Sequence, residues 1–290
     1  MQGDDAGAHL QLLLLALDRG DGAAAGEHQK AVEGKLGDAG LEALLEGRVK
    51  MAQGQPAAAA EAFARAAQTD PRRTDALLWG AAAQQAVPSR GAELALLTAA
   101  EQAEPARAGP FSPLSELSLR PEESLRAVEG PLEQLAQGAD PNSLVGLAVL
   151  RYHRRDWAGA EAALARALKV DAAFPQALAW RALVLLERGD GKGAVAAALL
   201  AQQRGRALPM VQYAAAAAAL AVGDLDGARR WLREVTQSAP GLLAAQVKLA
   251  EAETRAGATS VARERLRKVV HLDPSYASAK RALYLLPKEN

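Results

Sequence analysis

A strict 34-residue period constrains this chain more than any other feature. Alanines recur at Ala160, Ala194, Ala228 and Ala262, each 34 residues from the next. Other residues keep the same step: Gly189, Gly223 and Gly257; Pro71 and Pro105; Pro240 and Pro274; Gly20 and Gly54. A fixed period of roughly 20 to 50 residues indicates stacked supersecondary units. The units must follow one another with almost no insertion, because insertions would have disturbed the period.

Alanine dominates the apolar half of the sequence, and only 4% of the residues are aromatic. Alanine is the best helix former and lets helices approach closely. A β-sandwich would need many more β-branched and aromatic residues. The composition therefore predicts an all-α protein made of closely stacked helices. The absence of cysteine excludes disulfides, thiolate nucleophiles and thiolate metal sites.

Small and large residues occupy fixed positions within the 34-residue unit. With Ala160 at position 20, small residues fall at positions 8, 20 and 27, as Ala148 and Ala167 do. In the unit at 141–174, large apolar residues fall at positions 4, 7 and 24, which are Leu144, Leu147 and Leu164. Residues three or four apart share one face of a helix, so each unit is predicted to form two helices with one apolar stripe each. The units are 6–39, 40–73, 74–107, 141–174, 175–208, 209–242 and 243–276.

This pattern resembles that of the tetratricopeptide repeat family over nearly the full length of the chain. The resemblance implies two antiparallel helices in each unit, A and B, with the A helices lining a concave face. We therefore expect an all-α fold, an α-solenoid of about eight tetratricopeptide-like helical hairpins. A helix at 277–286 would cap its C-terminal end, as such stacks require. The pentatricopeptide family, whose unit of about 35 residues reads RNA, is disfavoured because the step here is 34 and the reading positions are mostly apolar.

A proline-rich segment interrupts the pattern at about 108–140. Its prolines are Pro110, Pro113, Pro121 and Pro131. Proline inside a helix removes a hydrogen bond and clashes with the preceding turn, and the step from Pro105 to Pro141 is 36 residues instead of 34. We expect an irregular joint here, between an N-terminal arm at 1–107 and a C-terminal arm at 141–290. The alternative is an ordinary repeat with shortened helices, because proline is tolerated in a first helical turn.

Glycine and aspartate mark the predicted turn between the two helices of a unit. Gly189, Gly223 and Gly257 fall at position 15, where a left-handed residue is wanted to end helix A. Asp156, Asp190 and Asp224 follow at position 16, where a carboxylate can cap the start of helix B.

The resemblance implies that positions 2, 5, 9 and 12 of helix A point into the concave groove. These positions are mostly apolar here, and the predicted partner-binding residues are Leu44, Arg48, Met51, Leu78, Val145, Val149, Tyr152, Leu183, Leu186, Met210, Tyr213, Leu220 and Val247. Tyr152, Met210 and Tyr213 are the strongest candidates, because aromatic residues and methionine are favoured at interface centres. The alternative is that these side chains pack against the adjacent repeat. No lysine lies at positions 2, 5 or 9, so a clamp for a C-terminal carboxylate is excluded.

The net charge is zero, but its distribution is uneven. Residues 1–140 hold 12 Lys and Arg against 21 Asp and Glu, whereas 141–290 hold 22 against 13. A basic outer ridge is predicted on the last two B helices, formed by Arg229, Arg230, Arg233, Arg263, Arg267 and Lys268, with Arg265 beside them. Such a ridge could bind an acidic partner, nucleic acid or an anionic membrane, or be an ordinary solvated face. Association of the acidic arm of one copy with the basic arm of another is a further possibility.

Nothing in the sequence has the arrangement of a catalytic or cofactor site. The histidines, His9, His28, His153 and His271, have no metal-ligand spacing. The segment from Gly189 to Gly193 contains glycines and a lysine but lacks the remaining residues of a phosphate-binding loop. We expect no enzymatic activity, no cofactor, no metal and no small-molecule substrate.

The sequence predicts a non-catalytic scaffold that binds an apolar or amphipathic protein segment in its groove. By resemblance to bacterial tetratricopeptide proteins, it would assemble an envelope, pilus or signalling complex. The alternatives are a regulatory or targeting module of a larger kinase or transferase, or one bound by a small GTPase, and then nucleic-acid or anionic-surface binding through the basic arm. Arginine (25) far exceeds lysine (9), which is typical of GC-rich bacteria. We expect a soluble protein of the cytoplasm, or of the periplasm if an export or lipoprotein signal precedes it.

Overall fold

The structure is a computed structural model that describes residues 6–71, 73–87, 93–104, 122–274 and 276–287. Within these ranges the chain forms α-helices joined by turns and contains no strand. The helices are α1 (Ala6–Asp18), α2 (Gly22–Val32), α3 (Ala39–Ala52), α4 (Pro56–Thr69), α5 (Thr74–Gln85), α6 (Glu93–Ala103), α9 (Glu122–Leu135), α10 (Pro141–His153), α11 (Trp157–Val170), α12 (Pro175–Glu187), α13 (Gly191–Gly205), α14 (Pro209–Ala221), α15 (Leu225–Ser238), α16 (Leu243–Arg255), α17 (Thr259–Leu272) and α18 (Ala277–Leu285).

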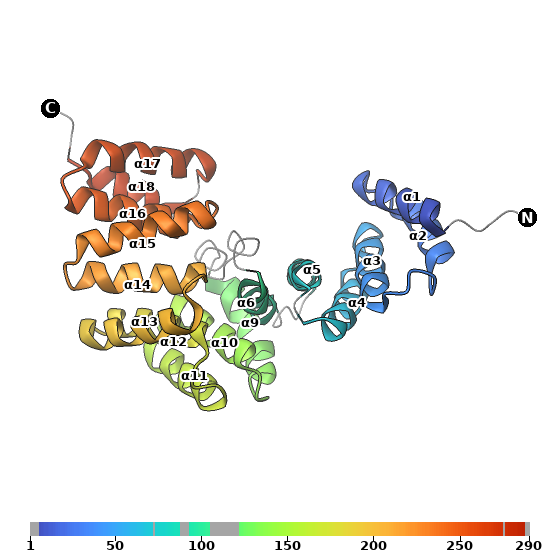
Figure 1. The fold of residues 1–290 in the computed structure, drawn as a ribbon, viewed down its shortest axis with the longest axis horizontal. Helices are drawn as coiled ribbons and strands as arrows, with labels where there is room; N and C mark the ends of the chain where they lie inside the picture. Colours follow the sequence, from blue (N-terminus) through green and yellow to red (C-terminus); the bar gives the residue numbers. More distant parts are fainter. Residues whose placement is uncertain (1–5, 72, 88–92, 105–121, 275, 288–290) are drawn as a thin grey trace, which may run out of the picture.

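The helices pair into antiparallel hairpins that stack along one direction. Figure 1 shows α10 to α18 as a compact stack and α1 to α4 as a smaller group at the other end of the molecule. Pro141, Pro175 and Pro209 each occupy the first turn of their helix, where a missing N–H costs nothing. The predicted all-α solenoid is confirmed.

The turns between paired helices have the predicted chemistry. Gly189, at the end of α12, has a φ of +80°, a left-handed conformation that favours glycine. The side chain of Asp190 then accepts a hydrogen bond from the backbone N–H of Gly193 at 2.8 Å and caps α13. Asp156 and Asp224 cap α11 and α15 in the same way. The glycine-rich segment that superficially resembles a phosphate loop is therefore a helix–helix turn.

The small residues of the period lie where neighbouring helices touch. Ala160, Ala194, Ala228 and Ala262 are completely buried. One large core cluster runs from Leu94 of α6 to Ala252 of α16, and Trp180 is its largest fully buried side chain. Smaller clusters hold α1 to α5 and the C-terminal end.

The α6 helix connects the two ends of the molecule. It packs against α5 on one side and against α10 on the other, while α9 packs on α10. The first part of the predicted joint lies outside the described residues, and its second part contains α9 with Pro131 inside the helix. At the C-terminal end α18 packs against α16 and α17.

Candidate functional site

A pocket of about 300 Å³ opens on the side formed by the A helices of the large stack. Its lining comes from α10, α12, α14 and α16, which are four successive A helices, and includes Tyr152, Leu183, Tyr213 and Leu220. We call the surface of these four helices the A-helix face. The 34-residue period brings residues far apart in sequence onto this one face, and the volume is at the lower end of the range for binding pockets.

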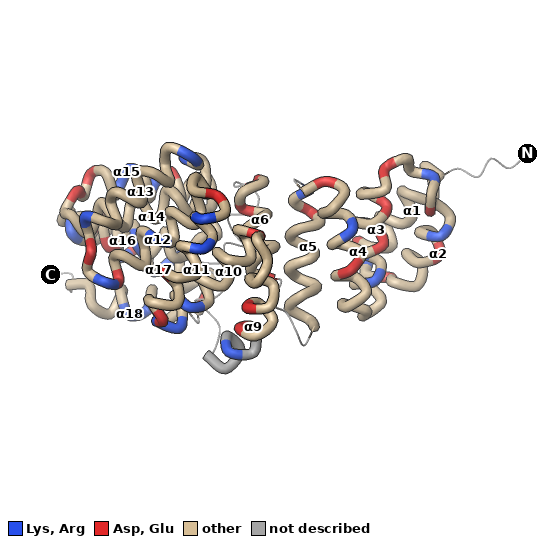
Figure 2. Tube along the Cα trace, turned by 90° about the horizontal axis from the view of Figure 1, so that it is seen from below, with Lys and Arg blue, Asp and Glu red and all other residues tan. Residues whose placement is uncertain are grey.

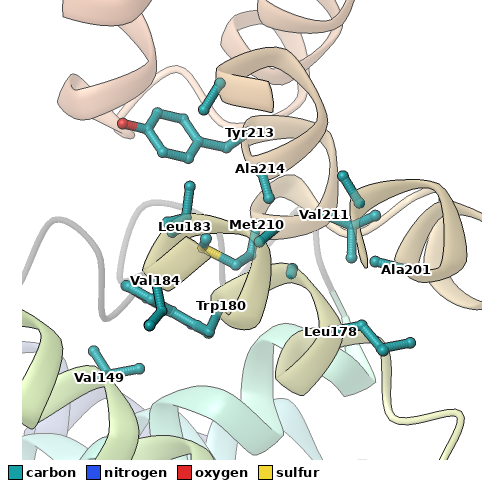
Figure 3. Close-up of a cluster of buried hydrophobic side chains, with 14 of the residues drawn as sticks. Val149, Leu178, Trp180, Leu183, Val184, Ala201, Met210, Val211, Tyr213 and Ala214 are labelled. Carbon is teal, nitrogen blue, oxygen red and sulfur yellow. The ribbon is translucent and has the colours of Figure 1, made fainter. Parts of the chain in front are cut away.

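The apolar part of the pocket is continuous with the core. Figure 3 shows the ring of Tyr213 above Leu183, with Met210 next to Leu183 and Trp180 deeper in the cluster. The ring of Tyr152 packs edge-to-face against those of Trp157 and Trp180, with centroids 5.2 and 5.3 Å away. Such edge-to-face pairs stabilise the packing of the pocket wall.

Charged side chains form the other part of the pocket, and they balance one another. Glu187 of α12 accepts a hydrogen bond from the Tyr152 hydroxyl at 3.1 Å. On α16, Lys248 forms an ion pair with Glu251 at 2.9 Å, and Arg255 donates to the carbonyl oxygen of Leu220 at 2.9 Å. Two acidic and two basic groups therefore surround an apolar centre.

The protonation states of the pocket follow from this environment. Burial raises the pKa of the Tyr152 hydroxyl, and neighbouring Glu187 raises it further. Burial likewise raises the pKa of Tyr213. Burial alone lowers the pKa of Lys248, but Tyr213, Glu251 and Glu187 outweigh it and the pKa is raised overall. The pocket therefore presents two neutral phenols and a charged ammonium at neutral pH.

The structure distributes the predicted groove residues over several surroundings. Five of them line the pocket together: Tyr152, Leu183, Leu186, Tyr213 and Leu220. Val145, Val149 and Met210 are fully buried in the same core cluster. The others lie elsewhere: Leu44 and Met51 in the cluster around Phe63, Leu78 beside Leu77, Val247 in the C-terminal cluster, and Arg48 over the ring of Trp79 at 5.7 Å.

Sequence reasoning missed most of the charged groups of the pocket. Glu187 and Arg255 fall at position 13 and Lys248 at position 6, outside the positions assigned to the groove, whereas Glu251 falls at groove position 9. The sequence contains one signal that could have predicted them, namely residues three or four positions away from a groove position on the same helix. Lys248 precedes Glu251 by three residues, so the two side chains are neighbours on the helix surface.

The basic residues of α15 and α17 differ in exposure and in the partners they contact. Arg230, Arg233, Arg267 and Lys268 are exposed, and Figure 2 marks basic segments around α13 and α15. Lys268 pairs with Glu264 at 2.7 Å. Arg265 instead forms a two-pronged ion pair with buried Glu253 of α16 and belongs to the interior of that hairpin. The basic outer ridge stays a predicted surface for anionic partners.

His153, next to the pocket, makes the fold sensitive to acid. Burial lowers the pKa of His153 from its ordinary 6.5 to about 4, and its Nε2 atom is enclosed with no hydrogen-bond partner among the described residues. The unfolded chain therefore binds an extra proton between these pH values. The free energy of unfolding should fall by about 2–3 kcal/mol from this group as the pH drops from 6.5 to 4.

Urea unfolding at pH 7 and pH 4.5 measures this effect. His153→Phe should remove that part of the acid sensitivity, whereas His271→Phe, at an exposed position, should retain it. Equal acid sensitivity in the wild type and His153→Phe would contradict the expectation.

Two further observations concern the described part of the chain. None of its helices is both long enough and apolar enough to cross a lipid bilayer. Over the same residues, no three His, Asp or Glu side chains gather where they could hold a metal ion.

Comparison with known proteins identifies the fold. No protein-family model matches the sequence, and no curated protein sequence matches it. Among solved structures, a chain of the APC/C hetero-tetramer Cut9–Hcn1 superposes with a TM-score of 0.54 at 11% identity, over 94% of this chain and 47% of that one. This chain therefore spans about half the length of that relative. A tetratricopeptide repeat protein from Parabacteroides merdae superposes with a TM-score of 0.50 at 14% identity, over 98% of this chain and 99% of that one. The fold is tetratricopeptide-like, as the period predicts.

Proposed function

We propose that the chain is a non-catalytic scaffold that binds a segment of a partner protein on the A-helix face, with the pocket at the centre of the contact. The observation that supports this most is the pocket itself, to which four successive A helices contribute aromatic, aliphatic and charged side chains. Concave sites that combine an apolar centre with a small number of placed polar groups are typical binding sites.

The pocket chemistry also suggests what kind of segment fits. The apolar centre around Leu183 and Leu220 suits one bulky apolar or aromatic side chain. The balanced charges of Glu187, Lys248, Glu251 and Arg255 suit flanking polar or oppositely charged residues rather than a purely apolar helix. The groove is therefore more polar than the sequence alone suggested.

The biological setting of this binding stays a prediction. A bacterial envelope, pilus or signalling complex is the first expectation, and service as a regulatory module beside a kinase or transferase is the second.

Selection of peptides from a random display library on the full chain tests the proposal. Ala221 lines the pocket but is exposed, so Ala221→Arg should fill the pocket without removing core packing. Peptides selected on the wild type should bind this variant at least about tenfold more weakly, a difference of about 1.4 kcal/mol.

Ala165→Arg is the matched control, because Ala165 is an exposed alanine on α11, a B helix that does not line the pocket. It should bind the same peptides as the wild type does. Equal affinity for the wild type and Ala221→Arg, measured by fluorescence anisotropy, would place the binding surface elsewhere.

A further inference from the structure

The α6 helix buries polar side chains to an unusual degree. Glu93, Thr98 and Glu101 all lie on this short helix, with 0%, 2% and 1% of their surfaces exposed. The Thr98 hydroxyl donates to the Leu94 carbonyl at 2.7 Å, and Glu93 accepts from Gln85 of α5 at 2.8 Å. Burying a polar group without a hydrogen-bond partner costs free energy. The hydrogen-bond partners of Glu101 therefore help to fix the position of α6.

Those partners lie on A helices much later in the chain. The Gln176 side chain of α12 donates to the Thr98 carbonyl at 2.7 Å. The backbone N–H of Met210 in α14 donates to the Glu101 carboxyl at 3.1 Å, across 109 residues of sequence. The N-cap residue of α14, Leu208, offers no side-chain acceptor, so Glu101 takes that role from another helix.

The contacted residues, Gln176 and Met210, belong to one row on the A-helix face. Asn142, Gln176 and Met210 are 34 residues apart, and each is the second residue of its helix. We call them the position-2 row. Asn142 lines a pocket of about 490 Å³ together with Ala99 and Ala103 of α6. The α6 helix therefore contacts the position-2 residues of α12 and α14 and shares a pocket with that of α10.

We propose that α6 is a releasable cover over the position-2 row, a helix of the chain itself that occupies one edge of the A-helix face until it is displaced. The consequence for partner binding rests on the function proposed above. The position-2 row and the pocket adjoin, because Met210 precedes Tyr213 by three residues on α14 and Gln176 precedes Leu183 by seven on α12. Release of α6 would extend the binding surface from the pocket to the N-terminal ends of the A helices.

The buried carboxyl supplies a means of release. Burial raises the pKa of Glu101 from 4.5 to about 7, although the hydrogen bonds of Met210 and Gln176 lower it. An acid with a raised pKa binds its proton more tightly in the docked state. Docking is therefore strongest below pH 4.5 and weakens as the pH rises to 7, when the undocked helix gains from ionisation.

Charged side chains of the packed helices are not among the groups that shift the pKa of Glu101. On α14 there is no Asp, Glu, Lys, Arg or His. Its titratable group is Tyr213. The charged or titratable groups of the other elements are Asp75 of α5, Glu93 of α6, Arg151, Tyr152 and His153 of α10, and Arg181 and Glu187 of α12. Arg151 pairs with Glu133, and Arg181 with Glu161. Burial, Met210 and Gln176 therefore set the pKa of Glu101.

Amide hydrogen exchange on the full chain at pH 5.5 and pH 8.5, corrected for intrinsic rates, tests the proposal. The amides of α6 and of Met210 should exchange at least about tenfold faster at pH 8.5. Glu101→Gln should abolish this pH dependence, whereas Glu93→Gln, which changes the other buried acid of the same helix, should keep it. Equal corrected rates at the two pH values in the wild type, or a pH dependence that survives Glu101→Gln, would overturn the proposal.

A disulfide lock gives a second measurement. The chain has no cysteine, and a Cβ placed on Gly146 would lie 3.1 Å from the Cβ of Leu94. This is shorter than the roughly 3.5–4.5 Å of a disulfide, so the two helices would separate slightly when the bond forms. In Leu94→Cys/Gly146→Cys, oxidation should abolish the pH-dependent exchange of α6 and reduction should restore it. A pH response that persists in the oxidised form would show that α6 does not leave. Neither measurement uses a partner, so its outcome is independent of the peptide selection.

Discussion

Replacing Trp180 by alanine is expected to lower the free energy of unfolding by about 3–5 kcal/mol. Trp180 is 2% exposed and is the largest fully buried side chain. It lies in the core cluster shared by α6 and α9 to α16, against the rings of Tyr152 and His153. Removal of the indole leaves a cavity that several helices border, and each would have to move to close it.

Denaturant unfolding followed by circular dichroism measures the loss. Trp79→Ala is the matched control, because Trp79 is 39% exposed and makes its main contacts with Phe63 and Arg48. It should cost much less than Trp180→Ala. Equal losses from the two substitutions would contradict the placement of Trp180 at the centre of the core.

Arg265→Met is expected to cost about 3–5 kcal/mol, because it leaves a buried carboxylate without its counter-ion. Glu253 of α16 is 3% exposed and accepts two hydrogen bonds from the Arg265 guanidinium, at 2.8 and 3.0 Å. Arg265 also donates to the Gln246 side chain at 2.9 Å. These bonds join α16 to α17 within one hairpin.

The double variant Arg265→Met/Glu253→Leu distinguishes the loss of the ion pair from the cost of leaving Glu253 buried without a partner. Replacing both partners with apolar groups of similar size removes the unpaired charge, so most of the lost stability should return. Thermal unfolding of the wild type, single and double variants measures this. A double variant as unstable as Arg265→Met would mean that the ion pair itself, and not the stranded charge, supports the hairpin.

The sequence predicts the hairpins and their turns because both depend on local, repeated chemistry. The left-handed glycine at Gly189 and the cap at Asp190 depend only on residues that are adjacent in the chain. The same glycine and aspartate recur at several other turns because of the period. Burial of the alanines at position 20 follows from the close approach of neighbouring helices.

The features that escape sequence reasoning are those that break the period. In the last unit position 11 holds Glu253, a buried acid whose partner cannot be found from the repeat pattern. Nothing local indicates that Glu101 would cap a helix 109 residues later. The partner of a single buried polar residue depends on how units that are distant in sequence stack on one another. The residues next to it in the sequence do not indicate that partner.

The long-range bond of Glu101 also bears on how the molecule folds. In an ordinary solenoid each unit touches only its neighbours, so assembly can start anywhere and spread with low contact order. The hydrogen bond between α6 and α14 can form only after the intervening chain has closed a loop. Closing that loop costs conformational entropy before the contact contributes any stability. The contact of α6 with α14 should therefore form late, after α10 to α14 have folded.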